Sequence, residues 1–138
     1  MNLRWAFLDR YADCGLLIIR LGLGAMFLIY HGWPKLIGGP DEWRNVGRAV
    51  GYLGLRNGYT AWGFVAALAE CGGGLCLMLG FAARPVALAL AIEMGVATIW
   101  RYYPFHTTGI AAHPFELAIV FLGLCITGPG KLSLDSCH

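Results

Sequence analysis

The sequence predicts an all-α fold: an integral membrane four-helix bundle with a short amphipathic interfacial helix in its first loop. The chain has 138 residues, of which 58% are hydrophobic and only 13% are charged, whereas soluble domains average about 25% charged residues. Four apolar stretches occur at about 14–35, 62–80, 82–100 and 112–128. Each approaches the ~20 residues that a helix needs to cross a bilayer. Residues 1–138 are therefore expected to form one transmembrane domain.

The first span follows a short polar and aromatic lead. Its apolar run is longer than the core of a typical secretory signal and no A-x-A cleavage site follows it, so we expect it to be retained as a helix. Proline disrupts helices, and the span is therefore expected to end near Pro34. The next residue, Lys35, is expected to extend its ammonium group to the lipid headgroups.

The first loop carries the signals of a surface helix. Residues 39–42 read Gly-Pro-Asp-Glu, with a proline and two acids where a helix begins. The apolar face of this helix is made by Trp43, Val46, Val50 and Leu53. Arg44 and Arg48 lie on the opposite face. Such a helix is typical of the membrane interface.

The remaining spans are separated by short connections. Only residues 80–85 join the second span to the third, which predicts an antiparallel hairpin. Pro114 is expected to begin the fourth span, because proline is favoured in the first turn of a helix. Gly-Pro-Gly at 128–130 is expected to end it.

Every span contains one charged residue: Arg20, Glu70, Glu93 and Glu116. A charge at the centre of a bilayer costs roughly 2.5–3.5 kcal/mol on insertion scales, so these side chains are expected to face one another inside the bundle. Counting ~1.5 Å per residue puts Glu70 and Glu93 about 15–16 Å deep, near the midplane. His31 and His113 are expected close to the loop-side face. The candidate ligand or proton site therefore consists of Arg20, His31, Glu70, Glu93, His113 and Glu116.

Three carboxylates and one arginine at similar depth are not expected to stay ionised together. At least one glutamate is expected to hold a proton at neutral pH, or the three to share protons. That arrangement suits proton uptake beside a redox step, or hydrogen bonding to a quinone carbonyl. The alternative is a cluster of buried ion pairs whose only role is to orient the helices. No catalytic residue is assigned.

The sequence does not predict a metal site. Di-iron bundles use two Glu-x-x-His motifs and two further glutamates, whereas this chain has three candidate glutamates and only the reversed order His113-x-x-Glu116. A haem is not expected either, because no two histidines are predicted to face each other at one depth. The five cysteines form no C-x-x-C pair and are expected to be small apolar fillers.

Several segments resemble the DoxX family of small bacterial four-helix membrane proteins. They are Arg-Leu-Gly-Leu-Gly at 20–24, His-Gly-Trp-Pro-Lys at 31–35, Glu70 ahead of three glycines, Gly80, Arg84-Pro85, and Gly-Pro-Gly-Lys-Leu-Ser-Leu-Asp at 128–135. The resemblance covers nearly the whole chain, through the order and spacing of these pieces.

The resemblance implies a multi-pass protein of the bacterial inner membrane with cytoplasmic termini. Proteins of this family are associated with thiosulfate:quinone oxidoreductase and with a membrane complex that handles thiols and oxidative stress. The lack of a redox-spaced cysteine pair argues against a thiol relay in this chain.

The function we expect is that of a membrane subunit of a redox system, a candidate oxidoreductase subunit that binds a quinone or a similar apolar carrier near the Glu/Arg cluster. The alternative is a non-catalytic scaffold or chaperone-like assembly protein whose buried charges are structural. The expected partners are the lipid bilayer and a protein of a membrane complex, with a homo-oligomer as another arrangement. A net charge of +2 with dispersed basic residues gives no basis for nucleic-acid binding.

Overall fold

The computed structural model describes residues 5–103 and 108–137, and within them it is helical with no strands. The elements are η1 (Ala6–Tyr11), α1 (Ala12–Met26), η2 (Phe27–Gly32), α2 (Trp33–Ile37), α3 (Gly39–Gly47), η3 (Arg48–Leu53), α4 (Tyr59–Leu79), α5 (Ala83–Tyr102), α6 (Thr108–Thr127) and η4 (Leu134–Cys137). Four helices are long and apolar enough to span a membrane: Phe7–Ile37, Tyr59–Leu79, Ala83–Tyr102 and Gly109–Thr127. The predicted all-α membrane fold is confirmed.

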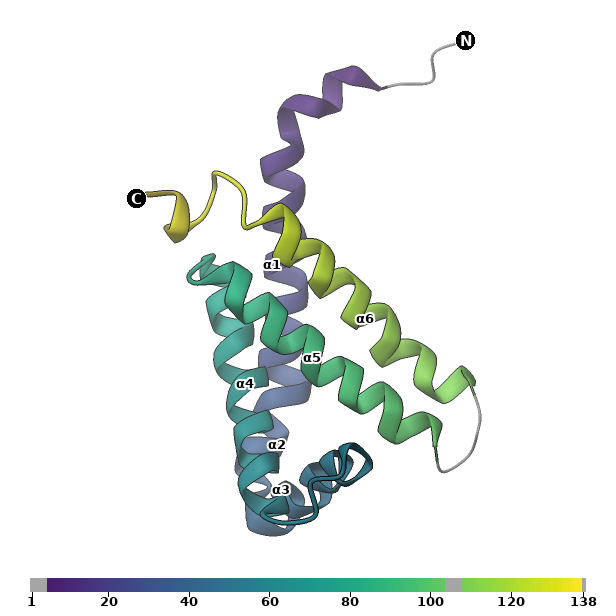
Figure 1. Cartoon of the computed structure of the whole chain (residues 1–138). Helices are drawn as coiled ribbons and strands as arrows, with labels where there is room; N and C mark the ends of the chain where they lie inside the picture. Colours follow the sequence, from purple (N-terminus) through teal and green to yellow (C-terminus); the bar gives the residue numbers. More distant parts are fainter. Residues whose placement is uncertain (1–4, 104–107, 138) are drawn as a thin grey trace.

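The bundle has two distinct ends (Figure 1). At one end, the terminal end, the α4–α5 turn and the C-terminal tail lie beside α1, and η1 with the start of α1 extends beyond the other helices. At the other end, the loop end, α2 and α3 lie against the start of α4. Helix α4 is the centre of the arrangement, because it contacts α1, η2, α2, α3 and α5. Helices α5 and α6 form an antiparallel hairpin beside it.

The core joins the first span to this hairpin. Phe27 is 1% exposed and meets Phe121 of α6 edge to face, with ring centroids 4.9 Å apart. Around this pair the core contains Leu77, Ala87, Leu90, Ala91, Met94, Ala118 and Leu124. Because the alanines of α5 are buried, α5 and α6 can approach closely, as small residues allow in membrane proteins.

Both prolines expected at helix boundaries lie elsewhere in their helices. The first span does not end at Pro34 but continues through η2 and α2 to Ile37. Pro34 follows closely after the π-helical turns of η2, and a proline inside a continuing helix removes one helical hydrogen bond. Pro114 lies inside α6, which begins at Thr108 rather than at Pro114. Pro114 is buried, and packing against neighbouring helices is what makes an internal proline tolerable in a spanning helix.

The predicted helix of the first loop is present and is pressed against α4. A Cβ atom on Gly47 would collide with the carbonyl oxygen of Tyr59, and one on Gly63 would collide with the carbonyl group of Trp43. The indole ring of Trp43 also packs on Phe64, 4.7 Å between centroids. Glycines therefore bring α3 into backbone contact with α4 at the loop end.

Candidate functional site

A π-helical segment positions the polar end of the first span. The six residues Phe27–Gly32 form η2 between α1 and α2, and π-helical turns within longer helices are frequent at functional sites. Gly32 packs so closely on α4 that a Cβ atom would collide with the backbone of Cys71. Cys71 directly follows Glu70, so this contact brings the first span onto the carboxylate of α4.

Lys35 and Glu70 form an ion pair between these two segments. Lys35 Nζ donates to Glu70 Oε1 across 2.5 Å. The side chain of Glu70 is fully buried, whereas that of Lys35 is 25% exposed. The pair therefore has one end inside the bundle and one end that reaches solvent or lipid headgroups.

Glu93 of α5 adds a second carboxyl group to this pair. Glu93 lies close enough to Glu70 to interact with it, and the charge of Lys35 acts on Glu93 as well as on Glu70. Within the described part of the chain, Glu70 Oε2 and Glu93 Oε2 are buried without a hydrogen-bond partner. Two ionised carboxylates are acceptors only, so a proton held between them would supply the missing donor. We call Lys35, Glu70 and Glu93 the lysine–glutamate cluster.

His31 and His113 are adjacent at the loop-side end of the same region. The His31 ring stacks on Phe27 at 4.9 Å and on His113 of α6 at 6.4 Å between centroids. The expectation that no two histidines face each other was therefore wrong. Its cause was the early start of α6, which places His113 one and a half turns inside the helix and beside the first span. Across residues 5–103 and 108–137, no three potential metal ligands come together.

An open cleft of about 670 Å³ leads to this region from the loop end. It is lined by Tyr30, His31, Pro34, Lys35, Gly38, Asp41, Glu42 and Asn45. Lys35 is common to the cleft and to the ion pair. A molecule in the cleft would thus meet an ammonium group that already holds Glu70, with the His31 ring beside it.

Arg20 does not join the lysine–glutamate cluster. Arg20 is 1% exposed, and its guanidinium group donates to the carbonyl oxygens of Leu77 and Leu132 near the terminal end. Leu77 is seven residues beyond Glu70, about 10 Å along α4. The sequence predicted that Arg20 pairs with the glutamates. In the structure it instead donates to two backbone carbonyls and lies near the charge of Asp135. The cation of the cluster is Lys35.

Glu116 also lies outside the cluster. It is exposed on α6, two residues from each of the buried residues Pro114 and Ala118, which places it about 200° around the helix from both. His113 is exposed as well, although its ring reaches His31. The structure thus brings together Glu70 with Glu93 and His31 with His113, and separates Arg20 and Glu116 from them.

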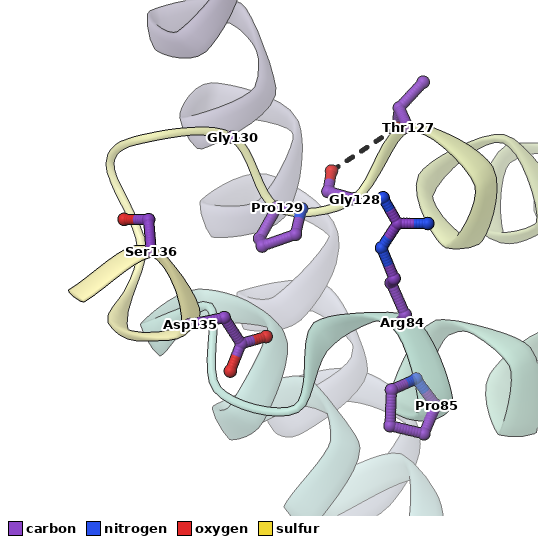
Figure 2. A pocket seen from close by; sticks show the side chains of 8 residues that line it. All are labelled: Arg84, Pro85, Thr127, Gly128, Pro129, Gly130, Asp135 and Ser136. Carbon is purple, nitrogen blue, oxygen red and sulfur yellow. Dashed lines mark hydrogen bonds between the residues drawn. The ribbon is translucent and has the colours of Figure 1, made fainter. Parts of the chain in front are cut away.

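Hydrogen bonds hold the C-terminal tail against the terminal end of the bundle. Asp135 Oδ1 and Oδ2 accept hydrogen bonds from the backbone amides of Ala82 and Ala83, each 2.8 Å long, and so cap the start of α5. Asp13 Oδ1 accepts from the amide of Lys131. Figure 2 shows the pocket of about 410 Å³ that remains between Arg84, Asp135 and the Gly128–Gly130 turn. Its Arg84 guanidinium group donates to the carbonyls of Cys125 and Ile126 at the end of α6.

One glycine is required at the centre of this arrangement. Gly80 adopts a positive φ of 66°, and a Cβ atom there would collide with the guanidinium group of Arg20 and with Ser133. The motif pieces at 20, 80, 84–85 and 128–135 therefore serve one structural purpose, which is to tie the tail to three spans. They do not line the lysine–glutamate cluster.

The comparisons with known proteins agree with this architecture. The DoxX family model matches residues 15–103. The chain is 33% identical to the inner membrane protein YphA of Escherichia coli over 141 residues, covering 91% of this chain and 96% of that protein. It is 28% identical to the inner membrane protein YqjF of the same organism over 138 residues, covering 93% and 95%. No solved structure matches it.

Proposed function

Because this chain belongs to the DoxX family of membrane proteins, we propose that it binds an apolar carrier with carbonyl groups, a quinone, in the cleft beside the lysine–glutamate cluster. In this proposal it is the carrier-binding subunit of a redox system in the bacterial inner membrane. The relatives that are named inner membrane proteins support that location.

The observation that carries the proposal is the double role of Lys35. It lines the 670 Å³ cleft and donates to the buried Glu70. Ligand sites are typically concave and mostly apolar, with a few convergent polar groups. Here Tyr30 and Pro34 supply apolar surface, while His31 and Lys35 supply hydrogen-bond donors.

In the proposed chemistry, protons and electrons reach the quinone from different sources. Reduction of a quinone to a quinol takes two electrons and two protons. The electrons would come from a partner subunit that carries a redox centre. One proton would come from the Glu70–Glu93 pair through Lys35 or His31, and the second from water in the open cleft, which would also return a proton to the pair. The unpartnered oxygens of both glutamates support this role, since a shared proton between them is available for transfer.

Binding of a short-chain benzoquinone to the purified protein in lipid nanodiscs tests the proposal. Lys35→Met removes the donor next to the cleft, and hydrogen bonds to charged groups contribute about 1.5–3 kcal/mol. We therefore expect affinity, followed by quenching of tryptophan fluorescence, to fall about tenfold or more. Lys131→Met is the matched control, because Lys131 is exposed on the tail and its hydrogen bonds are made by its backbone N–H, to Asp13, and its carbonyl oxygen, from Ser136. Equal affinity of the wild type and Lys35→Met would contradict the site.

Glu93→Gln separates a redox subunit from an assembly scaffold. Glutamine keeps the shape of the side chain but has no acidic proton to exchange. We expect normal folding, partner assembly and quinone binding, together with strongly reduced quinone-dependent electron transfer in membranes. Unchanged electron transfer alongside lost assembly would instead support the scaffold function.

A further inference from the structure

The outward face of α6 carries a carboxyl group, Glu116, that no side chain in the described part of the chain neutralises. Glu116 lies seven residues inside the span Gly109–Thr127, about 10 Å from its loop-side end. It is exposed, on the side opposite Pro114 and Ala118. No side chain among residues 5–103 and 108–137 forms an ion pair or hydrogen bond with it. A polar side chain at this depth is not expected to face acyl chains.

Three cations of the described spans, Lys35, Arg20 and Arg101, are not available to Glu116. Lys35 is held by Glu70, and Arg20 by the carbonyls of Leu77 and Leu132. Arg101 lies next to the loop-side end of α5, so it is about 10 Å shallower than Glu116. A second copy inserted in the same orientation would present the same cations at the same depths. His113, the other titratable group of this part of α6, has its ring on His31. A lysine or arginine at the level of Glu116 would therefore come from a different protein.

The surface around Glu116 combines small residues with two exposed β-branched side chains, Ile119 and Val120. Gly109 and Gly123 lie seven residues before and after it, and Ala112 lies four residues before it. Seven-residue and four-residue spacings put all of them on one helical face. A Cβ atom on Gly109 or Gly123 would meet nothing within 4 Å, so this face is open. Small residues beside one polar residue are typical of helix–helix interfaces in membranes.

We infer that this face of α6 docks a transmembrane helix of a second protein, which carries a lysine or arginine opposite Glu116. The interface lies away from the quinone cleft and does not depend on the proposed function. The ion pair with Glu116 would attract the two helices to each other, and the small residues Gly109, Ala112 and Gly123 would let their backbones approach.

A synthetic membrane helix tests the inference. The probe is a 21-residue leucine–alanine peptide with one lysine near its middle, within reach of Glu116 in either orientation, and its control has leucine at that position. Energy transfer between labelled peptide and labelled full-length protein in liposomes reports association. We expect the lysine peptide to bind the wild type about fivefold to tenfold more tightly than the control peptide. Equal binding of the two peptides would overturn the inference.

Variants assign the effect to Glu116. Glu116→Gln keeps the side-chain shape and should abolish the preference for the lysine peptide, whereas Asp41→Asn, at an exposed acid of the loop end, should retain it. Glu116→Lys should prefer a peptide that carries glutamate. A preference that persists in Glu116→Gln would overturn the inference. So would self-association of the wild-type chain that Glu116→Gln removes, because the occupant would then be a second copy.

Discussion

The contact between Lys35 and Glu70 sets the properties of the site at the scale of single residues. Burying a carboxylate without a partner is costly, and a buried pair recovers that cost only with good geometry. Here Glu70 is fully buried and its cation keeps one quarter of its side chain exposed. The ammonium group can therefore retain some hydration while it holds Glu70, and it is the part of the pair that a ligand can reach.

Removing the cation alone should destabilise the protein more than removing both charges. Lys35→Met leaves Glu70 buried without its partner, which typically costs about 3–5 kcal/mol. We expect Lys35→Met combined with Glu70→Gln to recover most of that loss, as measured by thermal unfolding in detergent. If the effects of the two single substitutions simply add in the double variant, the residues are not coupled.

The sequence identified two of the three cluster residues for a clear physical reason. A glutamate within an apolar span has few tolerable positions, so Glu70 and Glu93 were expected inside the bundle. Lys35 was missed because a lysine at the end of a span is equally well explained by contact with headgroups. Its four-residue spacing from His31 was the available signal. Glu116 was misplaced because α6 is apolar on all sides, so its sequence does not distinguish a buried face from an outward face.

At the scale of elements, the backbone contact between α3 and α4 is the feature that positions the first loop on the bundle. Gly47 and Gly63 allow a separation that no side chain would permit. This contact fixes the start of α3, whose residues Asp41 and Glu42 line the cleft. The amphipathic pattern predicted the helix, but only the structure shows that its glycine lies against α4.

Gly63→Ala should separate α3 from α4, because the added methyl group would overlap the carbonyl group of Trp43. Overpacking of this kind costs about 1–3 kcal/mol. We expect a lower unfolding temperature and a shift in the emission of Trp43, which packs on Phe64. Gly72→Ala is the matched control on the same helix, since its Cβ would meet nothing within 4 Å. Equal effects of the two substitutions would show that the contact is unimportant.

Asp135→Ala should loosen the terminal end by removing the cap of α5. Loss of such a cap costs about 1 kcal/mol, so hydrogen exchange at the amides of Ala82 and Ala83 should accelerate about fivefold or more. Lys131→Ala should leave these amides protected, because the bond from its backbone to Asp13 is retained. Protection that survives in Asp135→Ala would mean that the tail does not cap the helix.

At the scale of the whole molecule, the buried charges are divided between two levels. Buried Arg20 and exposed Asp135 tie the tail to the spans at the terminal end. Lys35 lines the cleft at the loop end and holds Glu70, with Glu93 close by. The sequence predicted the four spans because length and apolar composition suffice for that. It did not predict that the charged residues lie at two levels, because a sequence with one charged residue in each span does not show which of these side chains are in contact. The arrangement thus has one polar level that holds the tail and a second that is the proposed ligand site.

Photolabelling tests the central claim, a quinone site beside Lys35, most directly. An azido-substituted benzoquinone would be photolysed with the full-length protein in native membranes, and the labelled residues mapped by mass spectrometry. We predict labelling between Tyr30 and Asn45, around the cleft, which an excess of unlabelled quinone suppresses and Lys35→Met strongly reduces. Labelling that is confined to the lipid-facing surfaces of the spans, or that unlabelled quinone does not suppress, would contradict the claim.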